Sequence, residues 1–424
     1  MIQCNYLLIS FIVVFLTSSF FRWLLTKMNI NHQKTFGHTV PPVFQDEIDG
    51  DTLSRITDYS IESSRFQSLA RVVDDIILLV ILLSGILPWF AETILSFDLN
   101  FVLSGLLFFA GPALVGFIVE VPFSLYGTFV IEKKYGFSTI SPSLWLQDII
   151  KNVAISVVIG GILLGSFLAL MKGAATTWWF WGWLLFAAFQ LLVLWLYPLI
   201  IAPLFNRYEP VRDDELKERI VNTMGKAGLK IKGVYQMDAG TRSRHTNAYF
   251  TGIGATKRIV LYDTLLASHT SDEVLSVLAH EIGHWKKKHI LKQLVIIEMF
   301  SLFLFYGTYL LIDWPVMYRT FGVDQNIPYV GIFILSALFK PVSFFFTPLM
   351  SGISRAFEVE ADRYSRRLMG STRSLVNALK RLAKDNLANL HPHPLYVWFY
   401  YSHPPLVSRI AELRKMDGDG KEAY

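Results

Sequence analysis

The stretch Val277–His289, VLAHEIGHWKKKH, carries the pattern on which the interpretation of this chain depends. His280, Glu281 and His284 form an H-E-x-x-H motif, and residues four apart lie one turn apart on the same face of an α-helix. This spacing lets both imidazoles bind one Zn²⁺ at about 2.0–2.1 Å, with Glu281 beside the metal-bound water as general base. The alternative is a chance match, which ten histidines produce in about one such chain in a hundred.

A helix is predicted here because Thr270 and Glu273 form a capping box ahead of an apolar run. A catalytic zinc site commonly has three protein ligands and an open position for water. The third is expected from a separate helix that carries an inward-facing carboxylate. One zinc ion per chain is therefore expected if the sequence supplies such a helix.

The run SRAFEVEADRYS, Ser354–Ser365, supplies two carboxylates on one helical face. We expect Glu358 to be the third ligand and Asp362 to hold a ligand histidine by its other ring N–H. Small Ala361 permits close approach of the two helices. Glu360 is the competing ligand, but it points about 160° away from Glu358 on a helical wheel. A further alternative is that these carboxylates only pair with neighbouring arginines on a solvated face.

The composition is that of a membrane protein. Of 424 residues, 53% are hydrophobic and 17% are charged, whereas soluble domains average about 45–50% and about 25%. The single cysteine, Cys4, excludes an intramolecular disulfide and a cysteine-rich metal site. The net charge of +5 is modest, and no basic–aromatic pattern indicates nucleic acid. Membrane lipids are the expected surroundings, and the oligomeric state is left open.

Seven stretches are long and apolar enough to cross about 30 Å of hydrocarbon. The first lacks a basic region before it and is too long for a cleaved signal peptide, so we expect it to remain as an anchor. Glu298 and Lys340 fall inside spans, where a charge usually faces protein or water. The expected spans lie near Tyr6–Leu25, Ile76–Leu95, Phe101–Phe123, Val153–Leu170, Trp178–Phe205, Ile290–Ile312 and Tyr329–Leu349.

The distribution of Lys and Arg among the short connections predicts the orientation. If the N-terminus is outside, the outer connections hold only Lys172 and Arg319, whereas residues such as Lys133 lie inside. Both halves of the proposed metal site then lie on the cytosolic side.

Four regions are expected: 1–205 with five spans, 206–289 as a cytosolic protease segment, 290–349 with two more spans, and 350–424 with the third ligand. The second region contains strand-like runs that predict a small antiparallel sheet leading into the zinc helix. The expected fold class is therefore a mainly α polytopic membrane protein with a small cytosolic metalloprotease domain. The strand-like runs are Ile231–Met237, Asn247–Phe250 and Arg258–Tyr262.

These motifs together resemble a known family. H-E-I-G-H with E-x-x-x-D at Glu358–Asp362 is similar to the gluzincin metallopeptidases. The runs NAYF (Asn247–Phe250), RIVLYDTLL (Arg258–Leu266) and SHPP (Ser402–Pro405), with seven spans, resemble the type 1 CAAX prenyl proteases over nearly the whole chain. The resemblance implies a chamber enclosed by the spans, with zinc at its cytosolic end. It also implies removal of the C-terminal tripeptide from prenylated CAAX proteins or peptides.

The resemblance assigns roles to further residues. His280, His284 and Glu358 match the zinc ligands, Glu281 matches the catalytic glutamate, and Asp362 matches a position sometimes called a proton donor. His403 matches a histidine that faces the scissile carbonyl and could donate to the oxyanion. Asn247, Ala248 and Tyr249 match the strand edge on which substrate backbone lies. The alternatives are a plain edge strand and, for His403, a capping histidine before Pro404.

Two other functions are compatible with parts of the sequence. An HtpX-like quality-control metalloprotease acting on unprenylated proteins has fewer spans, so five spans ahead of the zinc helix argue against it. A seven-span transporter with an incidental H-E-x-x-H would place ionisable residues along the bilayer midplane. The short tail lacks an endoplasmic-reticulum retention signal, and the bacterial inner membrane is favoured, with the endoplasmic reticulum expected if the source is eukaryotic.

Overall fold

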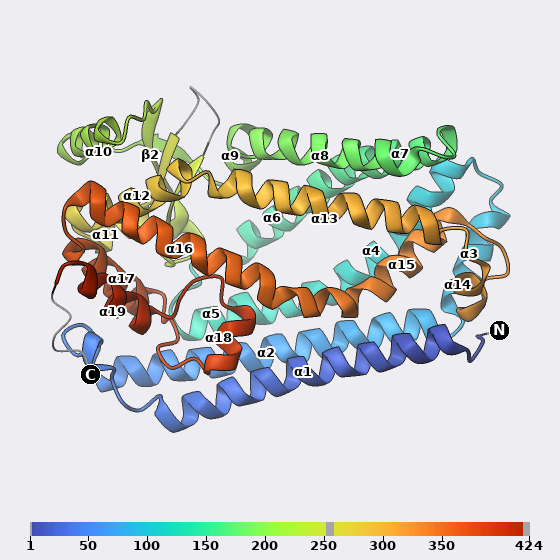
Figure 1. Cartoon of the computed structure of the whole chain (residues 1–424), viewed down its shortest axis with the longest axis horizontal. Coiled ribbons are helices and arrows are strands. Elements are labelled where there is room, and N and C mark those ends of the chain that lie inside the picture. Colours follow the sequence, from blue (N-terminus) through green and yellow to red (C-terminus); the bar gives the residue numbers. More distant parts are fainter. Residues whose placement is uncertain (1, 252–257, 419–424) are drawn as a thin grey trace.

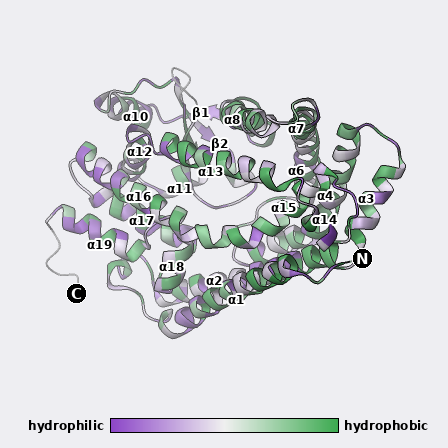
Figure 2. Cartoon of the chain, turned by 45° about the vertical axis from the view of Figure 1, so that its right-hand side comes forward, coloured by the Kyte–Doolittle hydropathy of each residue, from purple (hydrophilic) through white to green (hydrophobic). Residues whose placement is uncertain are grey.

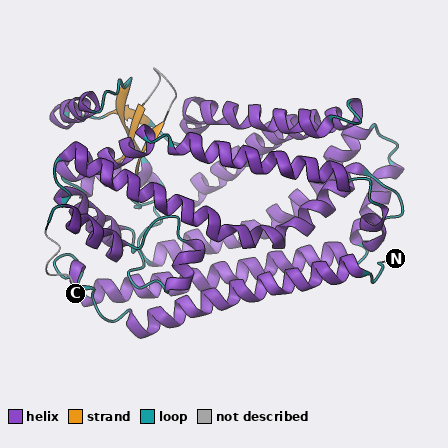
Figure 3. Cartoon of the chain, viewed as in Figure 1, coloured by secondary structure: helices purple, strands orange, loops and turns teal. Residues whose placement is uncertain are grey.

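The computed structural model describes residues 2–251 and 258–418, and it is mainly helical, as predicted (Figure 3). Long helices run along the longest axis of the molecule (Figure 1). The α-helices are α1 (Tyr6–Phe36), α2 (Gly50–Leu83), α3 (Ile86–Ser96), α4 (Phe101–Tyr126), α5 (Glu132–Lys134), α6 (Pro142–Ile155), α7 (Gly161–Gly173), α8 (Trp178–Leu196), α9 (Ala202–Phe205), α10 (Asp214–Lys226), α11 (Asp263–Ser268), α12 (Ser271–Lys286), α13 (His289–Leu311), α14 (Pro315–Thr320), α15 (Pro328–Ser343), α16 (Thr347–Met369), α17 (Arg373–Asp385), α18 (Pro394–Tyr400) and α19 (Leu406–Met416).

The seven predicted spans correspond to six long apolar helices and one bent pair. The bent pair is α2 with α3, whose axes differ by 63°. Gly85, at the break, has φ +85°, a conformation that glycine adopts without strain. The predicted span Ile76–Leu95 is therefore two helices. Five spans, counting the bent pair as one, precede the H-E-x-x-H helix α12.

The two ends of the helical bundle differ in character. Apolar residues dominate α4, α7, α8 and α13, whereas hydrophilic residues gather around α10, α17 and α19 (Figure 2). The sheet and helices α10 to α12 lie at this hydrophilic end, and α3 and α14 lie at the opposite end (Figure 1). The region predicted to be cytosolic is thus one contiguous end of the molecule.

The spans surround a cavity of about 740 Å³ between α13 and α15, which also reaches α1, α7 and α8. Its walls are mostly apolar, and they include Phe303 and Phe339. Lys340 lines one side, and its Nζ lies 3.6 Å from Asp75 Oδ1. Glu298, across the bundle, accepts a hydrogen bond of 2.6 Å from Gln190 Nε2. Glu298 therefore contacts protein, and Lys340, whose side chain is 47% exposed, lines the cavity beside Asp75, as the cost of a charge in hydrocarbon leads one to expect.

The sheet is mixed, so the predicted antiparallel arrangement is wrong. Its strands are β1 (Tyr208–Pro210), β2 (Gly233–Met237), β3 (Ala248–Thr251) and β4 (Arg258–Tyr262), in the order β1-β2-β4-β3. Strands β2 and β4 are parallel, and the other pairs are antiparallel. The most apolar strand, β4, buries Ile259, Val260 and Leu261 and takes a central place. Half-exposed β3 is left at the edge.

Candidate metal centre

Helices α12 and α16 bring the two halves of the predicted site together. Thr270 caps α12 and forms the predicted capping box with Glu273. The two helices cross so closely that a Cβ at Gly283 would lie 2.8 Å from the Cα of Ala361. The glycine of H-E-I-G-H is thus needed as a small residue, and it lies directly against the backbone of Ala361. This contact sets the distance between α12 and α16, and therefore lets the ligand side chains of the two helices meet.

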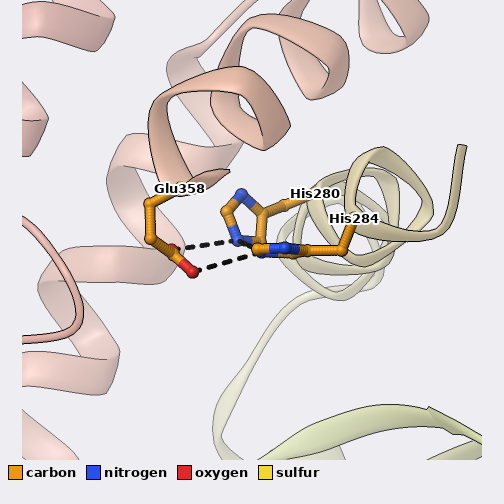
Figure 4. A group of neighbouring side chains, drawn as sticks. All are labelled: His280, His284 and Glu358. Carbon is orange, nitrogen blue, oxygen red and sulfur yellow. Dashed lines mark hydrogen bonds and ion pairs between the residues drawn. The ribbon is translucent and has the colours of Figure 1, made fainter. Parts of the chain in front are cut away.

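His280, His284 and Glu358 converge from these two helices (Figure 4). The Nε2 atoms of the two histidines face each other at 3.1 Å. Glu358 Oε2 lies 3.3 Å from His280 Nε2, and Glu358 Oε1 lies 3.2 Å from His284 Nε2. In residues 2–251 and 258–418, this is the only group of three such side chains found close enough to share a metal.

The donor set fits zinc. Ligand atoms about 2.0–2.1 Å from a tetrahedral zinc lie about 3.3 Å from one another, and the measured separations are 3.1–3.3 Å. Glu358 is buried; its Oε2 atom forms no hydrogen bond, and Arg409 NH1 lies 3.4 Å from it. A buried carboxylate is costly unless cations neutralise it, and a metal ion held by Glu358 would add to the charge of Arg409. Two imidazoles and one carboxylate are also the ligands of known catalytic zinc sites.

The second ring nitrogen of His280 is held by a buried ion pair. Its Nδ1 lies 2.8 Å from Asp362 Oδ1, which is the contact expected for this carboxylate. Asp362 in turn accepts two hydrogen bonds from Arg409, at 2.7 and 2.8 Å. The pair fixes which nitrogen of His280 faces the metal position. Arg409 was missed because nothing in its local sequence relates α19 to α12.

His284 is held by a different chain of contacts. Its Nδ1 lies 3.0 Å from His289 Nδ1, and His289 Nε2 lies 3.1 Å from Glu360 Oε2. The imidazole of His289 also stacks on the ring of Phe357. Glu360, the competing ligand candidate, therefore lies outside the donor group. It reaches the ligand His284 only through His289. His289 belongs to the motif stretch, but its role depends on α16 and could not be read from that stretch alone.

The donor group opens into a pocket of about 370 Å³. Glu281 lies in its wall, next in sequence to one ligand, and is partly buried. Burial raises the pKa of the Glu281 carboxyl, and the positive charge of neighbouring groups opposes this rise. A water molecule in this pocket would have the metal position and a basic carboxylate as neighbours.

His403 reaches the same pocket from the segment between α18 and α19. Its Nε2 lies 3.3 Å from Glu358 Oε1, and its Nδ1 contacts Ser402 Oγ at 2.9 Å. Its side chain is 62% exposed. The N-cap of α19 is Pro405, so the alternative of a helix-capping histidine is wrong.

The start of β3 contributes to the pocket wall. Asn247 and Ala248 line the pocket, as expected of a substrate edge. The side chain of Tyr249 points elsewhere: its hydroxyl lies 3.3 Å from that of Tyr208, and its ring contacts Tyr262. Of the three residues predicted for the substrate edge, Tyr249 can therefore contribute only through its backbone. The sheet order leaves the outer edge of β3 without a partner strand in the part of the chain that the structure describes.

Two family models match consecutive parts of the chain. Residues 29–207 match the N-terminal region of CAAX prenyl proteases, described as five membrane helices, and residues 210–417 match peptidase family M48. The chain is 34% identical to the CAAX prenyl protease 1 homolog of Oryza sativa over 395 residues, covering 91% of this chain and 92% of that protein. It is 32% identical to CAAX prenyl protease 1 of Saccharomyces cerevisiae, covering 90% of both.

A solved structure is similar over nearly the full length. The crystal structure of S. mikatae Ste24p matches with a TM-score of 0.90 and 30% sequence identity, covering 97% of this chain and 99% of that one. The M48 family implies a bound metal, and the convergent donor group agrees with it. The chain therefore belongs to peptidase family M48, among the CAAX prenyl protease 1 proteins, and it is a multi-pass membrane metallopeptidase.

Proposed function

We propose that this protein is a zinc endopeptidase that removes the C-terminal tripeptide from prenylated CAAX proteins at a membrane. The observation that carries the proposal is the convergence of His280, His284 and Glu358 beside β3, whose outer edge pairs with no strand in the described residues. The similarity to CAAX prenyl proteases along the whole chain supports the substrate class.

His280, His284 and Glu358 would hold one zinc ion per chain. When bound, zinc polarises a carbonyl oxygen and lowers the pKa of a bound water towards about 7. Asp362 and Arg409 keep His280 in the tautomer that presents Nε2, and His289 does the same for His284. These ligands are therefore preorganised before the metal binds, which reduces the cost of assembling the site.

Glu281 serves as the general base in this proposal. Its carboxylate takes a proton from the attacking water and passes it to the nitrogen of the leaving peptide. His403, across the pocket, is placed to donate a hydrogen bond to the oxygen of the tetrahedral intermediate. Asp362 already accepts three hydrogen bonds and stays ionised, so we assign it to positioning His280 and not to proton donation.

The peptide would bind as an added strand along β3. Backbone groups of residues 247 to 249 would pair with the substrate backbone, which binds a peptide with little side-chain selectivity. The prenyl chain would lie among the apolar walls between the spans. Each buried CH₂ contributes about 0.8 kcal/mol, so even two such groups favour the modified peptide by more than about tenfold.

The metal site would face the cytosol, because the Lys and Arg residues of the short connections gather at that end. The relatives named above are eukaryotic, which supports the endoplasmic reticulum membrane over the bacterial inner membrane that the sequence favoured. Membership of peptidase family M48 argues against the alternative that the chain is a transporter with an incidental H-E-x-x-H. The alternative, an HtpX-like activity on unprenylated proteins, is distinguished by the peptide-cleavage test described next.

The test is cleavage of a matched pair of peptides by the purified full chain. A farnesylated peptide ending in C-A-A-X should be cut directly after the modified cysteine, with kcat/KM at least about tenfold above that of the unmodified peptide. A chelator should abolish this activity, and added zinc should restore it. Equal rates on both peptides, or a preference for unfolded casein, would favour the quality-control function.

A further inference from the structure

Four polar side chains form a cluster just before β3 and outside the metal pocket. His245 Nε2 lies 3.1 Å from Glu132 Oε2, and His245 Nδ1 lies 3.0 Å from Asn386 Oδ1. The hydroxyl of Tyr59 donates to Glu132 Oε1 at 2.7 Å. The imidazole stacks on the ring of Phe137, with centroids 3.9 Å apart. The metal chemistry described above uses none of these residues.

The hydrogen bonds require a proton on both nitrogens of His245. The backbone N–H of Thr246 donates to Asn386 Oδ1 at 3.1 Å, so this atom is an acceptor and His245 Nδ1 must donate to it. An ionised carboxylate only accepts, so Nε2 must donate to Glu132. The ring is therefore an imidazolium, and stacking of a cation on Phe137 adds to its stability.

The same cluster fixes the backbone that leads into β3. Thr264 Oγ1 donates to the carbonyl of His245 at 2.8 Å. Asn386 Nδ2 donates to Thr246 Oγ1 at 3.1 Å while its Oδ1 accepts from the Thr246 N–H. The next two residues, Asn247 and Ala248, line the pocket. Loss of the cluster would remove the side-chain contacts that hold Thr246, the residue immediately before the proposed substrate edge.

The cluster also connects the two family regions. Tyr59 and Glu132 lie within residues 29–207, whereas His245 and Asn386 lie within residues 210–417. Phe137 belongs to an apolar core that also includes Ile56 of α2 and Leu379 of α17. The membrane region thus contacts the segment before β3 through this ion pair, through a second one between Asp148 and Arg242, and through a shared core.

From this arrangement we infer that His245, held as an imidazolium between Glu132 and Asn386, is a positioning residue that keeps β3 in place for peptide binding. The inference rests on the proposed function, because it takes β3 as the substrate edge. The class of ligand that it affects is any extended peptide that pairs with this strand. The prenyl group does not contact the cluster and plays no part in it.

The pH dependence follows from the partners of His245. Burial lowers the pKa of His245, but the hydrogen bonds to Glu132 and Asn386 and the charge of Glu132 outweigh burial and raise it above the usual value. The titratable groups facing the ring are Glu132 from α5 and, through it, Tyr59 from α2. The contribution of a cation with a raised pKa is complete below its ordinary pKa and is lost as pH rises through the raised one.

The experiment measures peptide affinity without turnover. In a Glu281→Ala background, the dissociation constants of fluorescent farnesylated and unmodified C-A-A-X peptides are measured from pH 6 to pH 10. The parent should lose affinity for both peptides at alkaline pH. His245→Ala should bind both about tenfold more weakly, as expected for one lost net hydrogen bond of about 1.4 kcal/mol, and its affinity should no longer fall at alkaline pH.

Two further variants separate positioning from stability. Glu132→Gln keeps the shape but removes the charge, so the pH at which affinity falls should move downwards. Lys380→Met is the matched control, because Lys380 lies on α17, its buried side chain pairs with the exposed Asp46, and neither residue belongs to the His245 cluster. It should lower the melting temperature but leave peptide affinity and its pH dependence unchanged.

The outcomes are distinct. An unchanged affinity and pH profile in His245→Ala would overturn the inference, as would an unchanged midpoint in Glu132→Gln. If the parent binds both peptides equally, the proposed prenylated substrate is wrong. The effect of His245 can still be measured on the unmodified peptide in that case, because the cluster acts on the backbone of β3.

Discussion

The substitution Asp362→Asn tests whether the buried ion pair behind His280 sets the affinity of the metal site. Asp362 accepts one hydrogen bond from His280 Nδ1 and two from Arg409, and its side chain is only 5% exposed. Asparagine has the same shape, but its NH₂ group cannot accept. One of the three N–H groups of His280 and Arg409 therefore faces the NH₂ group of the asparagine, which is also a donor. In addition, the charge of Arg409 is no longer balanced by this carboxylate.

The magnitude follows from these contacts. Loss of a carboxylate that orients a ligand histidine typically lowers metal affinity by about 10–100-fold, which corresponds to about 1.4–2.7 kcal/mol. A second effect acts in the same direction, because Arg409 NH1 already lies 3.4 Å from Glu358 Oε2. Without Asp362, the guanidinium should draw Glu358 away from the metal position. Breaking a buried ion pair also costs about 3–5 kcal/mol of folding stability.

Zinc affinity is measured by competition with a chromophoric chelator, and the stability of the metal-free protein is measured by thermal unfolding. The matched control is Glu360→Gln on the same helix. Glu360 is 41% exposed and reaches His284 only through His289, so its loss should change zinc affinity by less than about fivefold. If Asp362→Asn binds zinc as tightly as the parent, the ion pair does not position His280 and the argument fails.

Three other predictions concern the ligands, the base and the topology. Glu358→Ala should lose zinc, whereas Glu360→Ala should keep it, as metal analysis of both purified variants will show; the reverse result would exchange the two roles. Glu281→Ala should keep its zinc and lose peptide hydrolysis, so appreciable turnover of the farnesylated peptide by this variant would exclude Glu281 as the base. In a cysteine-free background, a cysteine at Lys172 should react with an impermeant reagent from outside and one at Lys133 only after permeabilisation; labelling of the second position in sealed cells would contradict a cytosolic metal site.

The sequence determined the features that depend on local periodicity. Four-residue spacing placed His280 with His284 and Glu358 with Asp362, and the structure brings all four side chains together. The helical wheel favoured Glu358 over Glu360, because two positions on one helix point in nearly opposite directions. Apolar length located the membrane helices, since crossing hydrocarbon requires about 20 apolar residues. The role of His403 came from the family resemblance, because its local sequence did not separate it from a capping residue.

Only the tertiary structure decided which partners hold these residues. Arg409 meets Asp362 across 47 residues, and His245 meets Glu132 across 113, and no local pattern relates such positions. The place of β4 between β2 and β3 was likewise set by burial of its apolar side chains, not by the order of the strands in the chain. A motif identifies the atoms that can bind a metal or a peptide. Packing between distant segments fixes their tautomers and positions, because buried charges and donors must find partners wherever the fold brings them together.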